Sequence, residues 1–209
     1  TRLRTVTGVQ TCALPISAGI PVNVTLIFSV ARYEAVIDAY MGGLEDRLRV
    51  DANAPLPRSV ASFFVSRVDT EIDRRLAEAS PLRGRAAVAN AKLAYRAFRA
   101  SLATERWAAL AAAGAHPQRP LWASTSTKNP DYPADLYVAP LVGPDTVNTL
   151  ADASLAVLSA PGTVLHADTV MLDLAAASAD IAALARAGVD FDDVTATLER
   201  EGVAAFVAS

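Results

Sequence analysis

The sequence predicts an α/β fold in which parallel strands alternate with helices. Short apolar runs of β type occur at residues 21–29, 60–65, 119–125 and 145–150. The stretches between most of them carry apolar side chains at helical spacing, and this alternation is typical of parallel βαβ units. Each run also ends in polar residues, and in a parallel sheet these ends share one edge, where ligands bind.

Capping signals and periodicity predict the helices. Ser29 is an N-cap candidate, and the residues after it place apolar side chains every three or four positions. Gly188 is a C-cap candidate between the last two helices. The expected helices are 30–50, 68–80, 85–102, 104–114, 152–158, 169–187 and 190–209. The apolar stretch 136–141 fits either a helix or an extended segment.

Two of the strands carry polar or charged groups that cost free energy if they are buried without partners. Asn23 and Thr25 lie two residues apart, so a strand directs both to one face. Ser62 and Phe64 repeat this spacing in the next strand, and Arg67 closes that run. A hydrogen-bonded polar pair in a core is the other interpretation of Asn23 and Thr25. The repetition favours a binding site.

The strand ends favour a barrel over a nucleotide-binding open sheet. No glycine-rich phosphate loop follows any of the predicted strands, and residues 124–129 (STSTKN) lack the glycines of a P-loop. Ser124 and Thr125 point to the same edge as the groups above, with a role in capping the core as the alternative. The single carboxylates Asp145, Asp168 and Asp173 receive no role, because such residues commonly cap helices.

Composition excludes several classes of function. The net charge of −3 leaves no basic face for nucleic acid. One cysteine, Cys12, and two histidines supply neither a disulfide nor a typical zinc site, so no metal is expected. No apolar run reaches the roughly 18 residues of a membrane span. A cytoplasmic enzyme without membrane or nucleic-acid partners is the expectation.

Residues 1–17 are expected to stand outside the fold, as a non-native or disordered segment before a domain at 18–209. They show neither helical nor strand periodicity. The run VTGVQTCALPI at residues 6–16 also resembles a translated sequencing adapter. On this interpretation the chain is the remaining part of a longer protein.

Several motifs, in order, resemble the class I transaldolases, especially their longer bacterial form. The motifs are VNVTLIFS at 22–29, VASFFVSRVD at 60–69, RPLWAST at 119–125 followed by KNP at 128–130, GPDTVNT at 143–149 and GVDFDDV at 188–194. The resemblance implies a (β/α)₈ TIM barrel, here incomplete, with about the last four strands and a helical C-terminal tail. It also implies transfer of a dihydroxyacetone unit between sugar phosphates in the pentose phosphate pathway, through a lysine Schiff base and without a cofactor.

The resemblance places the Schiff-base lysine upstream of this chain. Lys92 is expected to be a solvated or snorkelling helix residue, and Lys128 follows a strand in a polar loop, so neither fits a nucleophilic amine in a dry pocket. By resemblance, Asn23 and Thr25 hold substrate hydroxyls and the catalytic water.

The remaining roles concern the substrate. Ser62 resembles the serine that binds the ketose, Phe64 a wall of the pocket, and Arg67 the arginine that binds phosphate. Lys128 is a second phosphate contact or a surface lysine, and Ser124 lies at the rim.

Two other functions stay open. The first is a non-catalytic half-barrel that binds sugar phosphate or assembles with a partner, and the second is a related Schiff-base aldolase. An incomplete barrel leaves its strand edges and its inner face uncovered. We therefore also expect the isolated chain to self-associate, for example as a homo-oligomer.

Overall fold

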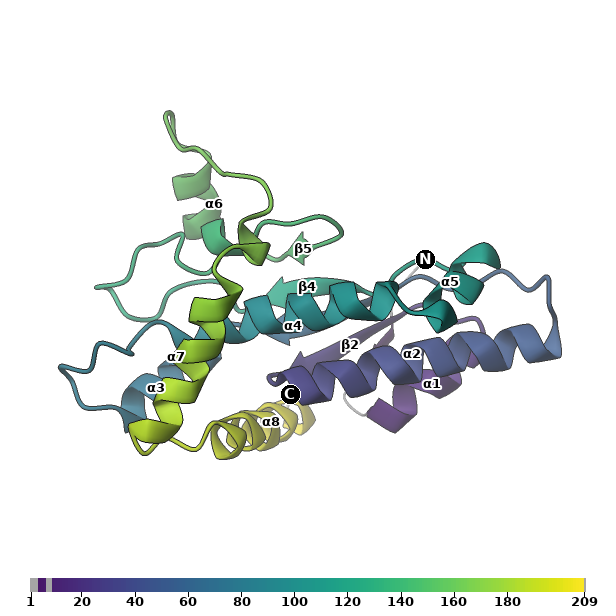
Figure 1. Ribbon diagram of the computed structural model, residues 1–209, viewed down its shortest axis with the longest axis horizontal. Helices are drawn as coiled ribbons and strands as arrows, with labels where there is room; N and C mark the ends of the chain where they lie inside the picture. Colours follow the sequence, from purple (N-terminus) through teal and green to yellow (C-terminus); the bar gives the residue numbers. More distant parts are fainter. Residues whose placement is uncertain (1–3, 7–8, 209) are drawn as a thin grey trace.

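A computed structural model describes residues 4–6 and 9–208. Its centre is a sheet of five strands, which are β1 (Arg4–Val6), β2 (Val22–Ile27), β3 (Ser59–Phe64), β4 (Arg119–Ala123) and β5 (Val147–Asn148). They lie in sequence order, and each is parallel to its neighbour (Figure 1). This confirms the predicted α/β fold. An order that never reverses is typical of part of a barrel rather than of a doubly wound sheet.

Helices connect and cover these strands. They are α1 (Val9–Ser17), α2 (Val30–Val50), α3 (Ser66–Arg75), α4 (Ala86–Leu102), α5 (Glu105–Ala112), α6 (Asp152–Leu158), α7 (Leu174–Arg186) and α8 (Phe191–Val207), with 3₁₀ turns η1 (Ala139–Leu141) and η2 (Thr169–Met171). The predicted bounds of α2 and α6 are confirmed, and Ser29 caps α2 by accepting a hydrogen bond from the Arg32 amide.

Two predicted helices differ from the structure. The third helix begins at Ser66 rather than at residue 68, so Arg67 lies in its first turn and not at the strand end. The predicted helix 169–187 is divided into η2 and α7, because Asp173 adopts a left-handed backbone with φ of 57° that no α-helix continues through.

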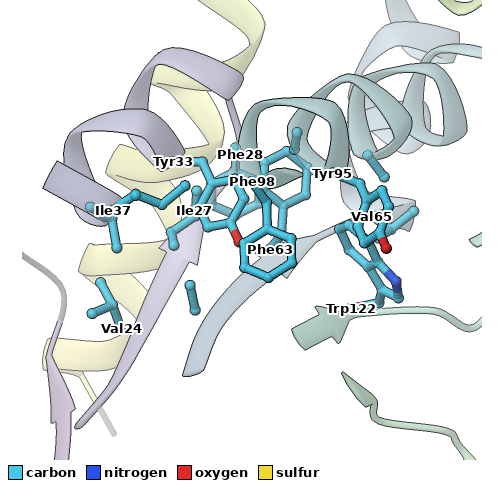
Figure 2. Packing of buried hydrophobic residues seen from close by; sticks show 14 of the residues in the cluster. Val24, Ile27, Phe28, Tyr33, Ile37, Phe63, Val65, Tyr95, Phe98 and Trp122 are labelled. Atoms are coloured by element: carbon cyan, nitrogen blue, oxygen red, sulfur yellow. The ribbon is translucent and has the colours of Figure 1, made fainter. Parts of the chain in front are cut away.

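The main core lies between one face of the sheet and helices α2 and α4. Phe63 of β3 is fully buried there, with ring centroids 5.9 Å from Tyr33 and 6.0 Å from Trp122, both at edge-to-face angles. Figure 2 shows these rings packed with Phe98 of α4. Burying rings of this size supplies several kilocalories per mole of driving force for the fold.

The opposite face of the sheet is only partly covered. The strand register places Val60 beside Asn23 and Ser62 beside Leu121. Val60, Leu121 and Val147 remain half-buried, whereas the residues on the helix-covered face are fully buried. A sheet with helices on one face and mixed apolar and polar side chains on the other is the arrangement of a barrel wall.

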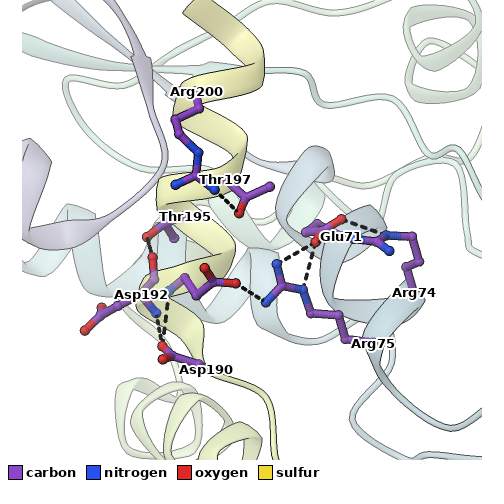
Figure 3. Close-up of polar contacts among 9 residues, drawn as sticks. Glu71, Arg74, Arg75, Asp190, Asp192, Thr195, Thr197 and Arg200 are labelled. Carbon is purple, nitrogen blue, oxygen red and sulfur yellow. Dashed lines mark hydrogen bonds and ion pairs between the residues drawn. The ribbon is translucent and has the colours of Figure 1, made fainter.

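Charged groups join helix α8 to the helices α3 and α2. Glu71 of α3 accepts hydrogen bonds from Arg74 and Arg75, which hold the pKa of Glu71 below its usual value, and Arg75 also reaches Asp193 of α8 at 2.7 Å (Figure 3). At its other side α8 meets α2 through an ion pair between Arg32 and Glu199. In these contacts the arginines near residue 74 are interleaved with acidic groups.

The amino-terminal segment differs from its prediction. β1 pairs with β2, and α1 packs on α2 where the sequence shows no periodicity. Cys12 and Ile16, four residues apart, are fully buried, and Gly43 of α2 lets the α1 backbone approach closely. Two buried positions are too few for a periodic signal, which is why the helix was not predicted. The remainder of the segment, residues 1–3 and 7–8, lies outside the described residues, and its foreign origin stays a prediction.

Candidate functional site

Asn23 and Ser62 meet across two neighbouring strands. The Ser62 hydroxyl donates a hydrogen bond of 2.7 Å to the Asn23 side-chain oxygen. Ser62 is buried and Asn23 is half-buried, so the Asn23 amide lies at the border between the sheet and open space. Because the Ser62 proton occupies the amide oxygen, the Asn23 NH₂ group is left to donate to a ligand.

Thr25 lies two residues further along β2, immediately before an irregularity. The pairing of β2 with β3 shifts register between Val24 and Ile27, and Leu26 has a φ of 61°, which is rare for a residue with this side chain. A Cβ on Gly202 of α8 would lie 2.9 Å from a Leu26 methyl group, so α8 packs tightly against this kink. Bulges of this kind occur next to ligand sites, where they direct side chains.

Phe64 and Arg67 continue the site toward the start of α3. The Arg67 guanidinium carbon lies 5.1 Å from the centre of the Phe64 ring, and Phe28 packs against the same ring at 5.2 Å. This cation–π contact holds an exposed arginine near the end of β3. Phe64 shares its strand face with Ser62, about 7 Å away at two residues of rise. Asn23 and Ser62 therefore face one side of the sheet, with Asn23 one residue after the start of β2, while Phe64 ends β3 and Arg67 follows in α3.

Ser124 joins the end of β4 to the start of α3. Its hydroxyl lies 2.9 Å from that of Ser66, and its carbonyl accepts a hydrogen bond from the Ser66 amide. Ser124 has a φ of 55°, so the chain turns sharply at this rim position. Thr125 is buried and donates its hydroxyl to the Thr149 carbonyl. Both contacts are structural, and they fit the predicted alternative of a capped core.

Lys128 is exposed beside this rim and does not contact the residues described above. Its ammonium lies 3.5 Å from the Ser126 hydroxyl, and it lines a hollow of about 470 Å³ together with Thr70, Arg74 and Arg83. Thr70 and Arg74 follow Arg67 on the exposed side of α3, at positions three and seven residues further on. The same hollow includes Asp73, and Arg74 is paired with Glu71, so Lys128 lies among groups of both charges.

Lys92 corrects the expectation of a solvated lysine. It is only 8% exposed, its ammonium donates to the Leu172 carbonyl at 2.8 Å, and burial lowers its pKa. The residue lines a cavity of about 250 Å³ between α4 and α7. The neighbouring residues Leu93 and Tyr95 do not predict the burial of Lys92, because α7, which covers Lys92, is distant in sequence. Its position among the helices keeps it away from the polar strand ends.

Asp69 was not singled out from the sequence. It is 1% exposed on α3, and its Oδ1 accepts the Ala87 amide at 2.8 Å, which caps the first turn of α4. Burial raises its pKa to about 7, more than the hydrogen bond from Ala87 lowers it. A carboxylate that caps a helix distant in sequence leaves no local motif.

Among residues 4–6 and 9–208, no group of three histidine, cysteine, aspartate or glutamate side chains is placed to hold a metal ion. Within the same residues, no helix is long and apolar enough to cross a membrane.

The fold and the site define an α/β protein with candidate polar groups on one face of a parallel sheet and at the start of α3. A family model described as Transaldolase/Fructose-6-phosphate aldolase matches residues 4–209, and the chain belongs to this family.

Three relatives carry the name transaldolase. The chain is 54% identical over 209 residues to "Transaldolase" of Acidothermus cellulolyticus, a match that covers 98% of this chain and 56% of the relative. It is 50% identical to "Transaldolase" of Thermobifida fusca, over 98% of the chain and 57% of the relative, and 53% identical to "Transaldolase 1" of Streptomyces avermitilis, over 91% and 52%. The chain spans about half the length of these relatives.

Proposed function

We propose that this chain is part of a transaldolase that moves a dihydroxyacetone unit between sugar phosphates. The donor and acceptor pairs are sedoheptulose 7-phosphate with glyceraldehyde 3-phosphate and fructose 6-phosphate with erythrose 4-phosphate. The observation that carries the proposal is the hydrogen bond between Ser62 and Asn23, a polar pair on one face of a transaldolase-family sheet. Such a pathway for sugar phosphates suggests the cytoplasm as its compartment.

The reaction needs a lysine that forms a Schiff base with the ketose, and we propose that this lysine lies in the half of the relatives that this chain does not match. Lys92 and Lys128 are the two lysines of the chain. Lys128 is exposed in a polar loop rather than enclosed in a dry pocket, and Lys92 lies among the helices. We therefore expect the chain alone to be inactive.

Each polar group of the candidate site then has a chemical task. Schiff-base formation releases one water molecule and its hydrolysis consumes one, so a group must hold water beside the reacting carbon. Asn23 and Thr25 are neutral and do not titrate near pH 7, and they suit this task at every working pH. Ser62 and Phe64 shape the ketose site, while Arg67 offers a planar fork to the phosphate.

The proposal is tested by completing the protein. A hybrid joins residues 18–209 to the part of the Acidothermus cellulolyticus relative that precedes the position matching residue 18, and its transfer of the three-carbon unit from fructose 6-phosphate to erythrose 4-phosphate is measured. Transfer is expected from the hybrid and not from the 209-residue chain. A folded hybrid that leaves both sugars unchanged would contradict the proposal, and one that uses a free ketone or aldehyde instead would favour a related aldolase.

Arg67 is tested in the same hybrid. Arg67→Ala removes a charge-assisted phosphate contact worth about 1.5 kcal/mol, so KM for fructose 6-phosphate should rise about tenfold. Arg96→Ala, which removes an exposed arginine from the outer helix α4, is the matched control and should leave KM unchanged. Equal KM values for both variants would remove Arg67 from the site.

A second candidate function, a half-barrel that binds sugar phosphate or associates with another copy, is favoured by the half-buried sheet face at Val60, Leu121 and Val147. We expect the isolated chain to self-associate through this face. Size-exclusion chromatography with light scattering checks it, and a monomer with a cooperative melting transition would contradict it.

A further inference from the structure

A hollow of about 320 Å³ lies at the amino-terminal ends of β3 and β4. Its walls include Arg58, Ser59, His116, Arg119 and Asp145. The strand β3 is six residues long, so this hollow lies roughly 16 Å along the strand from Phe64 and the candidate site at the other end. None of its residues was given a role above.

Two arginines, Arg58 and Arg119, bring positive charge to this hollow. Among the described residues, no carboxylate lies within ion-pair distance of Arg58 or Arg119. The Arg58 guanidinium lies 3.4 Å from Nε2 of His116 instead. An imidazole nitrogen can accept a hydrogen bond from a guanidinium but supplies no negative charge, so this contact does not neutralise Arg58.

Arg119 is held in a fixed orientation. Its Nε and Nη2 atoms donate to the carbonyls of Asp145 and Thr146, at 3.2 and 2.9 Å. These bonds use part of the guanidinium and immobilise it, while Nη1 remains for another acceptor. A cation that is ordered before its ligand arrives loses less conformational entropy on binding.

The Asp145 carboxylate is the single acidic group among the residues that line the hollow, against the two guanidinium groups of Arg58 and Arg119. Ser59 is already used, since its hydroxyl donates to the Val22 carbonyl and accepts from Gln118. The balance of charge therefore favours an anion. Guanidinium forks match the oxygen spacing of phosphate better than a lysine does, and the volume admits phosphate or a small phosphate ester.

We propose that this hollow is a second anion site that binds phosphate or the phosphate group of a small metabolite, with Arg58, Arg119 and His116 as its contacts. The site is separate from the first turn of α3, where Arg67 lies. It does not depend on the proposed transaldolase activity, because its geometry uses none of the same residues.

The two histidines of the chain give a direct test by NMR. The protein is labelled with ¹³C-histidine, and inorganic phosphate is added at constant pH and ionic strength. The ring signals of His116 should move along a saturating curve, while those of His166, which is exposed between α6 and η2, should not. Signals that move together, or a His116 signal that does not move, would overturn the proposal.

Variants assign the effect to the hollow. Arg58→Gln should weaken the phosphate response of His116 at least tenfold, and it should fold normally because the Arg58 side chain is exposed and bonds only to His116. Arg67→Ala should leave the response unchanged. A titration with fructose 6-phosphate in place of phosphate distinguishes a phosphate ester from the free ion. If the His116 signals move at a concentration equal to or lower than that needed with phosphate, the ligand is a phosphorylated metabolite. Loss of the response in Arg67→Ala, or its survival in Arg58→Gln, would contradict the assignment.

Discussion

Substitution of two adjacent glycines in α2 tests whether residues 9–17 pack as part of the fold. A Cβ at Gly43 would lie 2.8 Å from the Ala13 carbonyl oxygen and 2.8 Å from a methyl group of Ile16, both in α1. A Cβ at Gly42 would meet only the Arg106 guanidinium, at an ordinary 3.7 Å. The two substitutions therefore make the same change in the same helix. They differ in that only the Cβ at Gly43 would meet α1.

The magnitudes give the two variants opposite signs. Replacing glycine by alanine inside a helix stabilises it by about 1 kcal/mol. For Gly43→Ala the clash with backbone and a branched side chain costs typically about 1–3 kcal/mol, and a carbonyl oxygen cannot move aside as a flexible side chain can. Gly42→Ala should thus gain about 1 kcal/mol in the free energy of unfolding, while Gly43→Ala should lose up to about 2 kcal/mol.

Urea unfolding followed by tryptophan fluorescence measures both values in the 209-residue chain and in a chain that begins at residue 18. In the shorter chain the clash is absent, so Gly43→Ala should stabilise as Gly42→Ala does. A stabilising Gly43→Ala in the full chain would refute the packing of α1 on α2, and residues 9–17 would then stand outside the fold as the sequence predicts.

Two further substitutions test the core and its buried charge. Phe63→Ala empties the space between Tyr33 and Trp122 and should lower the free energy of unfolding by about 3–5 kcal/mol in urea titrations; a loss under 1 kcal/mol would contradict the described packing. Because burial raises the pKa of Asp69 to about 7, the folded chain holds a proton that the unfolded chain releases near pH 4, so stability should fall as pH rises from 4 to 7, by up to about 4 kcal/mol. Asp69→Asn, which keeps an acceptor for Ala87, should flatten this slope in melts at pH 5 and 8, and an unchanged slope would assign it to other groups.

Much of the scaffold could be predicted because its signals are local. The N-cap Ser29 and the apolar spacing after it define α2 to the residue, since both lie within one helix. The spacing of Asn23 and Ser62 within their own strands likewise places both at one face, and the structure joins them by a hydrogen bond. What the pattern lacks is the bulge at Leu26, which depends on packing against Gly202 nearly two hundred residues away.

The remaining differences come from contacts that join distant segments. Arg67 lies in a helix rather than at a strand end, because the Ser66 amide and hydroxyl bond to Ser124 and start α3 two residues early. Lys92 is buried by α7, and Asp69 caps a helix that begins seventeen residues later. Each of these depends on a partner that no local pattern identifies, so it appears only when the chain is folded.

The central claim is that the polar groups of β2 and β3 form part of a substrate site. Trapping of the bound substrate tests this claim most directly. The hybrid enzyme, completed with the upstream part of the Acidothermus cellulolyticus relative, is incubated with fructose 6-phosphate and reduced with borohydride, which fixes a Schiff base covalently. Mass spectrometry should then show a dihydroxyacetone adduct on a lysine of the upstream part, with less adduct when Asn23→Ala and Ser62→Ala are introduced together. No adduct, or one on Lys92 or Lys128, would contradict the placement of the site.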